Sequence, residues 1–138
     1  MTAITRAEAL ARVEAGIAKA EEIGVDMNIA IVDDGGHLVQ FSRQDNAWLG
    51  SIDIALKKAK TAVLFRMPTS VIGEISQPGG PVYGIEHSNA GLVTFGGGLP
   101  ITDEEGNVIG AVGVSGGDVV QDTTVAEAVV RAAVPARA

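Results

Sequence analysis

The chain has 138 residues, of which 46% are hydrophobic, and its 10 basic and 17 acidic side chains give a net charge of −7. This length fits one domain, residues 1–138, with a sizeable aliphatic core. The acidic balance argues against nucleic acid or an anionic membrane as a partner, because both attract basic surfaces. The chain has no cysteine, no long apolar run and no signal-peptide pattern, so we expect a cytoplasmic protein without disulfides.

Apolar periodicity and turn residues divide the chain into helices and strands. Thr5 and Glu8 have the spacing of a capping box, and Gly24 stands where a C-cap glycine belongs. Asp118 and Gln121 repeat the capping spacing before the last helical pattern. The predicted segments, in chain order, are a helix over 4–23, strands over 27–32 and 37–41, a helix over 46–66, a short helix over 69–75, strands over 92–95, 99–102 and 108–114, and a helix from 118 onward.

Short connections between the predicted strands indicate the fold class. Asp-Asp-Gly-Gly separates the first two strands, and this type of sequence is a strong hairpin signal. We therefore expect an α+β fold in which helices pack on a five-stranded, mainly antiparallel sheet. Residues 77–91 are rich in glycine and proline and predict a long loop. Loops of that length inside a compact domain are uncommon and are often functional.

Three consecutive glycines, Gly96, Gly97 and Gly98, follow the predicted strand over 92–95. Glycine loses more backbone freedom on folding than any other residue, so this glycine run (residues 96–98) indicates an unusual turn or a close approach by another group. Successive backbone amides can hold a carboxylate, a phosphate or a propionate. A bulge or bend entering the next strand explains the same residues equally well.

The long loop carries the acid–base candidates of the chain. His87 beside Glu86 can act as a general base or a haem or metal ligand, although a surface histidine in a turn is the more frequent case. Tyr83 can line a pocket or stack on a planar ligand, and Asn89 belongs to the same polar segment. His37 opens a strand, where exposure at the sheet end is usual. The spacing of these residues matches no dedicated metal site.

Three charged residues on the predicted helices have functional and structural interpretations. Lys58 projects from a stripe of small residues and can pair with an anionic ligand near the glycine run, or be an ordinary solvated lysine. Arg66 ends its helix and is expected to pair with the last carbonyls. Asp122 lies near the start of the last helix, where a cap or dipole partner is more usual than a catalytic acid.

Four motifs in order resemble the GlcG/HbpS family of haem-binding-like domains, which also occur as the C-terminal domain of PduO-type proteins. The motifs are residues 32–38 with Phe41, Arg43 and Asp45; Ser51, Ala55, Lys58, Ala59, Thr61 and Ala62; residues 95–101; and residues 110–117. The resemblance implies an α-β-α arrangement around a five-stranded antiparallel sheet and homo-oligomers built from dimers. It also implies haem binding in some members, while other members are encoded beside catabolic enzymes.

Three functions remain open at this point. The first is an oligomeric binding protein for haem or a related planar or anionic ligand, held by Lys58, Tyr83, His87, Asn89 and the glycine run. The second is a catabolic enzyme of an organic-acid pathway, a tautomerase, isomerase or lyase, in which His87 or Glu86 moves the proton while Lys58 and the glycine amides hold the anion. The third is a structural oligomer without a ligand.

Overall fold

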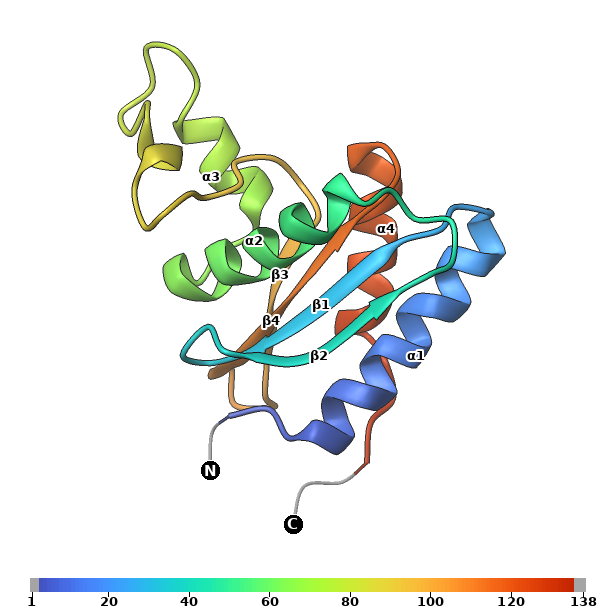
Figure 1. The fold of residues 1–138 in the computed structure, drawn as a ribbon. Helices are drawn as coiled ribbons and strands as arrows, with labels where there is room; N and C mark the ends of the chain where they lie inside the picture. The colour runs from blue at the N-terminus through green and yellow to red at the C-terminus, as the bar shows by residue number, and fades with distance from the viewer. Residues whose placement is uncertain (1–2, 136–138) are drawn as a thin grey trace.

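The computed structural model describes residues 3–135, in which helices cover both faces of one antiparallel sheet (Figure 1). The strands follow the order β2-β1-β4-β3, and every neighbouring pair is antiparallel. The predicted α+β class is therefore confirmed. The elements are α1 (Arg6–Ile23), β1 (Asn28–Asp33), β2 (Leu38–Arg43), α2 (Gly50–Phe65), α3 (Thr69–Ile75), the 3-10 turn η1 (Ile85–His87), β3 (Gly98–Thr102), β4 (Val108–Ser115) and α4 (Val119–Val130).

The predicted fifth strand, over residues 92–95, is wrong, and the described sheet has four strands. This segment contacts α2 and α3 instead of pairing with a strand. The Val93 amide donates to Thr61 Oγ1 of α2 at 3.1 Å. The carbonyl of Thr94 lies so close to Gly73 of α3 that a Cβ there would be 2.2 Å from the oxygen. Leu92 and Val93 are buried although they belong to no strand, and such a short buried apolar run gives the same sequence pattern as a strand.

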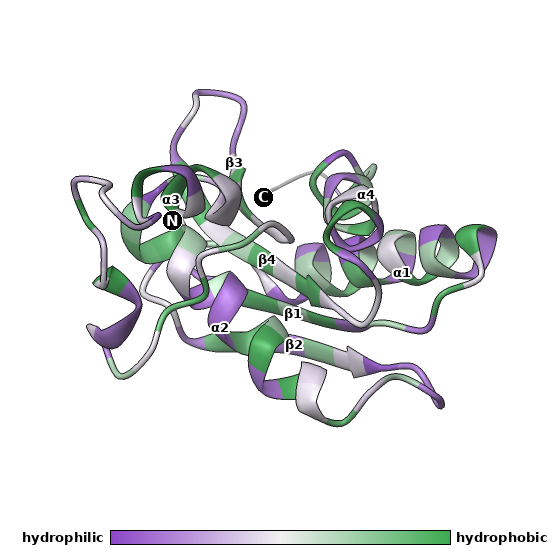
Figure 2. Ribbon diagram, turned by 90° about the horizontal axis from the view of Figure 1, so that it is seen from above, coloured by the Kyte–Doolittle hydropathy of each residue, from purple (hydrophilic) through white to green (hydrophobic). Residues whose placement is uncertain are grey.

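The two faces of the sheet have different cores. Alternate residues of β1 and β4, such as Ile29 and Val112, pack with α1 and α4, and Figure 2 shows these two helices together on one side of the strands. The other face carries small side chains, such as Ala30 and Ala111, beneath α2. Gly113 of β4 is where the backbone of α2 comes closest to the sheet, since a Cβ there would lie 2.0 Å from the carbonyl oxygen of Ala55.

The predicted helix ends are largely confirmed. Thr5 with Glu8 and Asp118 with Gln121 both form capping boxes, and Gly24 is left-handed with a φ of 73°. Arg66 differs from the prediction because it caps α2 through its backbone. Its N–H donates to the carbonyl of Ala62 and its φ is 55°. Within residues 3–135, no helix has the length and hydropathy that a membrane span requires.

Candidate functional site

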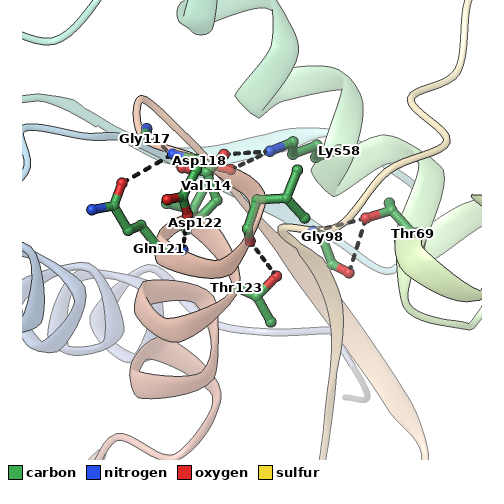
Figure 3. A network of polar contacts seen from close by, with 10 residues as sticks. Lys58, Thr69, Gly98, Val114, Gly117, Asp118, Gln121, Asp122 and Thr123 are labelled. Carbon is green, nitrogen blue, oxygen red and sulfur yellow. Dashed lines mark hydrogen bonds and ion pairs between the residues drawn. The ribbon is translucent and has the colours of Figure 1, made fainter.

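Lys58 is completely buried, and its side chain connects α2 to α4 (Figure 3). Its Nζ donates to Asp122 Oδ2 at 2.9 Å and to the carbonyl of Val114 at 2.8 Å. The Phe95 ring centroid lies 5.1 Å from Nζ, within the range of a cation–π contact. Lys58 thus lies beside the glycine run, as expected, but the anion it contacts is a side chain of the protein.

The glycine run makes room for this lysine. A Cβ at Gly97 would be 2.6 Å from Lys58 Nζ and 2.7 Å from the Val114 carbonyl, and Gly97 has a φ of 120°. A Cβ at Gly98 would be 2.6 Å from the Lys58 carbonyl. Thr69 Oγ1 accepts the N–H of Gly98 at 3.0 Å. The close approach that the glycines predict is therefore made by the protein itself: by α2 at Gly97 and Gly98, and by Val119 of α4 at Gly96.

The Lys58 side chain reaches from one helical layer to the other. α2 packs on the face of Ala30 and Ala111, whereas α4 packs on the opposite face. The Lys58 ammonium ends against the Val114 carbonyl and beside the bend at Gly97, whose own carbonyl accepts the Val114 N–H at 2.9 Å. The lysine thereby joins the two helical layers.

Asp122 bonds to the backbone near the start of α4, as its sequence position predicted, and it also forms an ion pair that was not predicted. Its Oδ1 accepts the N–H of Gly117 at 2.9 Å, just before α4, as a residue near a helix start can do. The ion pair through Oδ2 was not predicted, because its partner lies 64 residues away and no local spacing encodes it. The helix cap itself is Asp118.

Burial dominates the electrostatics of this pair. It lowers the pKa of Lys58 and raises the pKa of Asp122, while the hydrogen bond and charge attraction between them act in the opposite direction. The net shifts mean that desolvation exceeds the mutual stabilisation. Because burying two charges costs free energy that their attraction must offset, we expect the pair to fix the position of α2 against α4 more than it adds to stability.

The loop candidates form a separate, exposed group. Tyr83 is 67% exposed, and His87 and Asn89 are also exposed. They belong to the segment after α3, which extends away from the sheet in Figure 1. Lys60 Nζ donates to the carbonyl of Asn89 and holds the loop on α2. Because the loop residues are exposed and Lys58 is buried, the two groups do not share one pocket.

Glu86 stands out within the loop. Its Oε1 is buried and has no hydrogen-bond partner among residues 3–135. The neighbouring His87 ends the same 3-10 turn. His37, the other histidine, is exposed at the β1–β2 turn, with Nδ1 3.2 Å from Asp33 Oδ1. In the described part of the chain, no three His, Asp or Glu side chains converge as metal ligands would.

The comparisons with known proteins identify the family. The family model described as "Haem degrading protein HbpS-like" matches residues 4–131. The chain belongs to the HbpS-like family. The resemblance drawn from the four motifs is therefore confirmed, and the HbpS-like domain accounts for nearly the whole chain.

Relatives of this HbpS-like chain differ in length. A 15.0 kDa protein of the dhaT-dhaS intergenic region of Citrobacter freundii is 46% identical and covers 90% of this chain and 87% of its own. The corrinoid adenosyltransferase PduO of Citrobacter freundii is 40% identical over 86% of this chain but only 35% of its own length. The crystal structure of a PduOC–haem complex matches with a TM-score of 0.88 and 34% identity over 93% of each chain.

Proposed function

We propose that this protein binds haem. The observation that carries the proposal is the close likeness, in fold and sequence, to a domain whose crystal structure is a haem complex. The family match over residues 4–131 includes the glycine run, the long loop and the Lys58–Asp122 pair. The adenosyltransferase activity named for PduO is not part of the proposal, because this chain spans about a third of that protein.

The long loop offers the best iron ligand for such a haem. Imidazole is a common axial ligand of haem iron, and the chain has two histidines and no cysteine. His87 is exposed on the loop, and Tyr83, 67% exposed, offers an aromatic ring for stacking a few residues away. Apolar Val71 and Ile75 of α3 are also partly exposed beside this segment. When bound, haem would supply the redox-active iron; the chain supplies an imidazole and apolar contacts.

One loop covers only one face of a haem, so the proposal includes self-association. A second protomer that packs on the exposed α3 and loop residues would cover the other face and bury Val71, Ile75 and Tyr83. A homodimer, or a larger assembly of dimers, is thus the expected form with haem. Light scattering of the protein with and without haemin measures this state directly.

Titration of the purified protein with haemin tests the binding proposal. We expect a saturable shift of the Soret band for the wild type and for His37→Ala. The haem affinity of His87→Ala should be lower by about tenfold or more, because an iron–nitrogen bond is lost. His37 is the matched control, being an exposed histidine in a turn. Non-saturating absorbance with the wild type would remove the haem proposal. An unchanged spectrum in His87→Ala would remove only the role of His87.

A second candidate is a catabolic enzyme that moves a proton in an organic acid. The specific observation in its favour is Glu86 Oε1, a buried carboxylate oxygen without a hydrogen-bond partner in the described chain, since a carboxylate placed beside a substrate can act as a general base. Replacing Glu86 by Gln keeps the shape and removes the base, so turnover should fall by about 100-fold or more. The measurement is product formation by the two proteins side by side, and equal rates would eliminate this candidate.

A further inference from the structure

A cavity of about 380 Å³ opens to solvent at one end of the sheet. Its lining comes from three segments: Asp34 of the β1–β2 turn, Arg66 at the end of α2, and Gly106, Asn107 and Val108 where the β3–β4 turn enters β4. The antiparallel ladder brings the two turns to the same end of the sheet (Figure 1). The volume lies in the range of small-molecule sites, and none of these residues belongs to the haem proposal.

Arg66 occupies a position that usually favours glycine. Its φ is 55°, and its N–H donates to the carbonyl of Ala62, the arrangement that a glycine commonly provides after the last turn of a helix. The left-handed conformation costs an arginine more free energy than a glycine, because the Cβ crowds the backbone. The guanidinium forms no hydrogen bond or ion pair within residues 3–135, and it lies at the cavity. A ligand held by this side chain would account for arginine at a strained position.

Asp34 provides the opposite charge, because the other aspartates of the two turns are engaged with the backbone. Asp33 Oδ1 accepts the N–H of His37 at 2.9 Å. Asp103 Oδ1 accepts the N–H of Asn107 at 2.9 Å, and its Oδ2 accepts Asn107 Nδ2 at 3.0 Å. The exposed carboxylate of Asp34 has no such partner in the described chain, so it can bind a cationic group at the cavity.

The polar groups at the cavity select the chemistry of a ligand. Asn107 Nδ2 is bonded to Asp103, which leaves Asn107 Oδ1 as a neutral acceptor. A guanidinium such as that of Arg66 binds a carboxylate through two parallel hydrogen bonds. An ammonium group has three donors, which suit Asp34 and Asn107 Oδ1. A ligand with only one of these charges would meet a like charge in the same cavity.

We propose that this cavity binds a small zwitterion with one carboxylate and one ammonium group, such as a free amino acid. Arg66 holds the carboxylate, while Asp34 and Asn107 Oδ1 hold the ammonium group. Val108, which is partly buried, provides an apolar contact for the ligand's side chain.

An NMR titration with three probes of similar shape tests the site: L-valine, 3-methylbutanoate and isobutylamine. The second probe is valine without its ammonium group, and the third is valine without its carboxylate. Saturable shifts of the backbone amides of Asp34, Gly106 and Asn107 are expected with L-valine. Binding of each singly charged probe should be about tenfold weaker or less, because one charge-assisted hydrogen-bonded contact is missing.

Substitutions of the two charged residues provide the second test. Arg66→Gln and Asp34→Asn should each weaken L-valine binding by about tenfold. Arg43→Gln is the matched control, since Arg43 is an exposed arginine at the far end of β2, and it should bind L-valine as the wild type does. Arg66→Gly removes the guanidinium but suits the left-handed backbone, so its melting temperature should be at or above that of the wild type. Binding lost in this variant is therefore not lost through unfolding.

Several results would overturn the proposal. These are shifts that never saturate, equal responses to all three probes, or L-valine binding that is unchanged in both Arg66→Gln and Asp34→Asn. A crystal structure grown with L-valine gives a further measurement. A valine carboxylate on the Arg66 guanidinium would support the site, whereas a direct ion pair between Arg66 and Asp34 that closes the cavity would contradict it.

Discussion

Replacing Asp122 by Leu is expected to lower the free energy of unfolding by about 3–5 kcal/mol, because it leaves the Lys58 ammonium buried without a counter-charge. Lys58 is 0% exposed and Asp122 only 4%, so water cannot take over the lost interaction. Lys58→Met should destabilise by a similar amount by leaving the carboxylate alone. The double variant Lys58→Met/Asp122→Leu should recover most of the loss, since apolar pairs of similar volume replace buried ion pairs well. Urea unfolding of the four proteins gives the cycle.

The control for this cycle is an exposed pair. Arg131 Nη2 lies 3.2 Å from Glu127 Oε2, with side chains 77% and 43% exposed. Glu127→Gln should change stability by less than about 0.5 kcal/mol, as is usual for surface ion pairs. If the losses from Lys58→Met and Asp122→Leu simply added in the double variant, the two groups would not be coupled, and the ion pair would not fix α2 against α4.

Gly113→Ala is expected to destabilise the protein by about 3 kcal/mol. The new Cβ would lie 2.0 Å from the carbonyl oxygen of Ala55 and 2.5 Å from the amide nitrogen of Ala59. Both atoms belong to the backbone of α2, so the whole helix must move away from the sheet. That movement would also lengthen the contacts of Lys58 with Val114 and Asp122. Thermal or urea unfolding measures the loss.

Gly50→Ala is the matched control for this substitution. Gly50 is also a glycine of the α2 layer, but nothing lies within 4 Å of its Cβ position. Its replacement should leave stability within about 0.5 kcal/mol of the wild type. Similar effects of Gly113→Ala and Gly50→Ala would show that the close packing of α2 on β4 contributes little.

Local signals predicted most of the fold. Thr5 and Asp118 are caps whose side chains bond to amides three residues away, and Gly24 adopts the left-handed conformation that favours glycine. Such interactions lie within a few residues of sequence, so the pattern contains them. The short helix over 69–75 was also predicted to the residue, directly after Pro68.

Interactions between distant segments were not predictable from the chain. The run at 92–95 has the composition of a strand, and only its tertiary contacts with Thr61 and Gly73 show that it lies under helices. Lys58 and Asp122 are 64 residues apart, and no spacing rule links them. The glycine run did mark a close approach, but its partner was identifiable only in three dimensions.

The position of Lys58 between the two helical layers has an evolutionary consequence. Positions 58, 97, 113 and 122 are far apart in sequence, yet each limits what the others can become. A side chain at Gly97 would collide with Lys58, and one at Gly113 would push α2 away from the sheet. Loss of Asp122 would leave the Lys58 ammonium buried without a counter-charge. We therefore expect homologues to keep these four residues or to change them together. Few single substitutions at any one of the four positions should be tolerated.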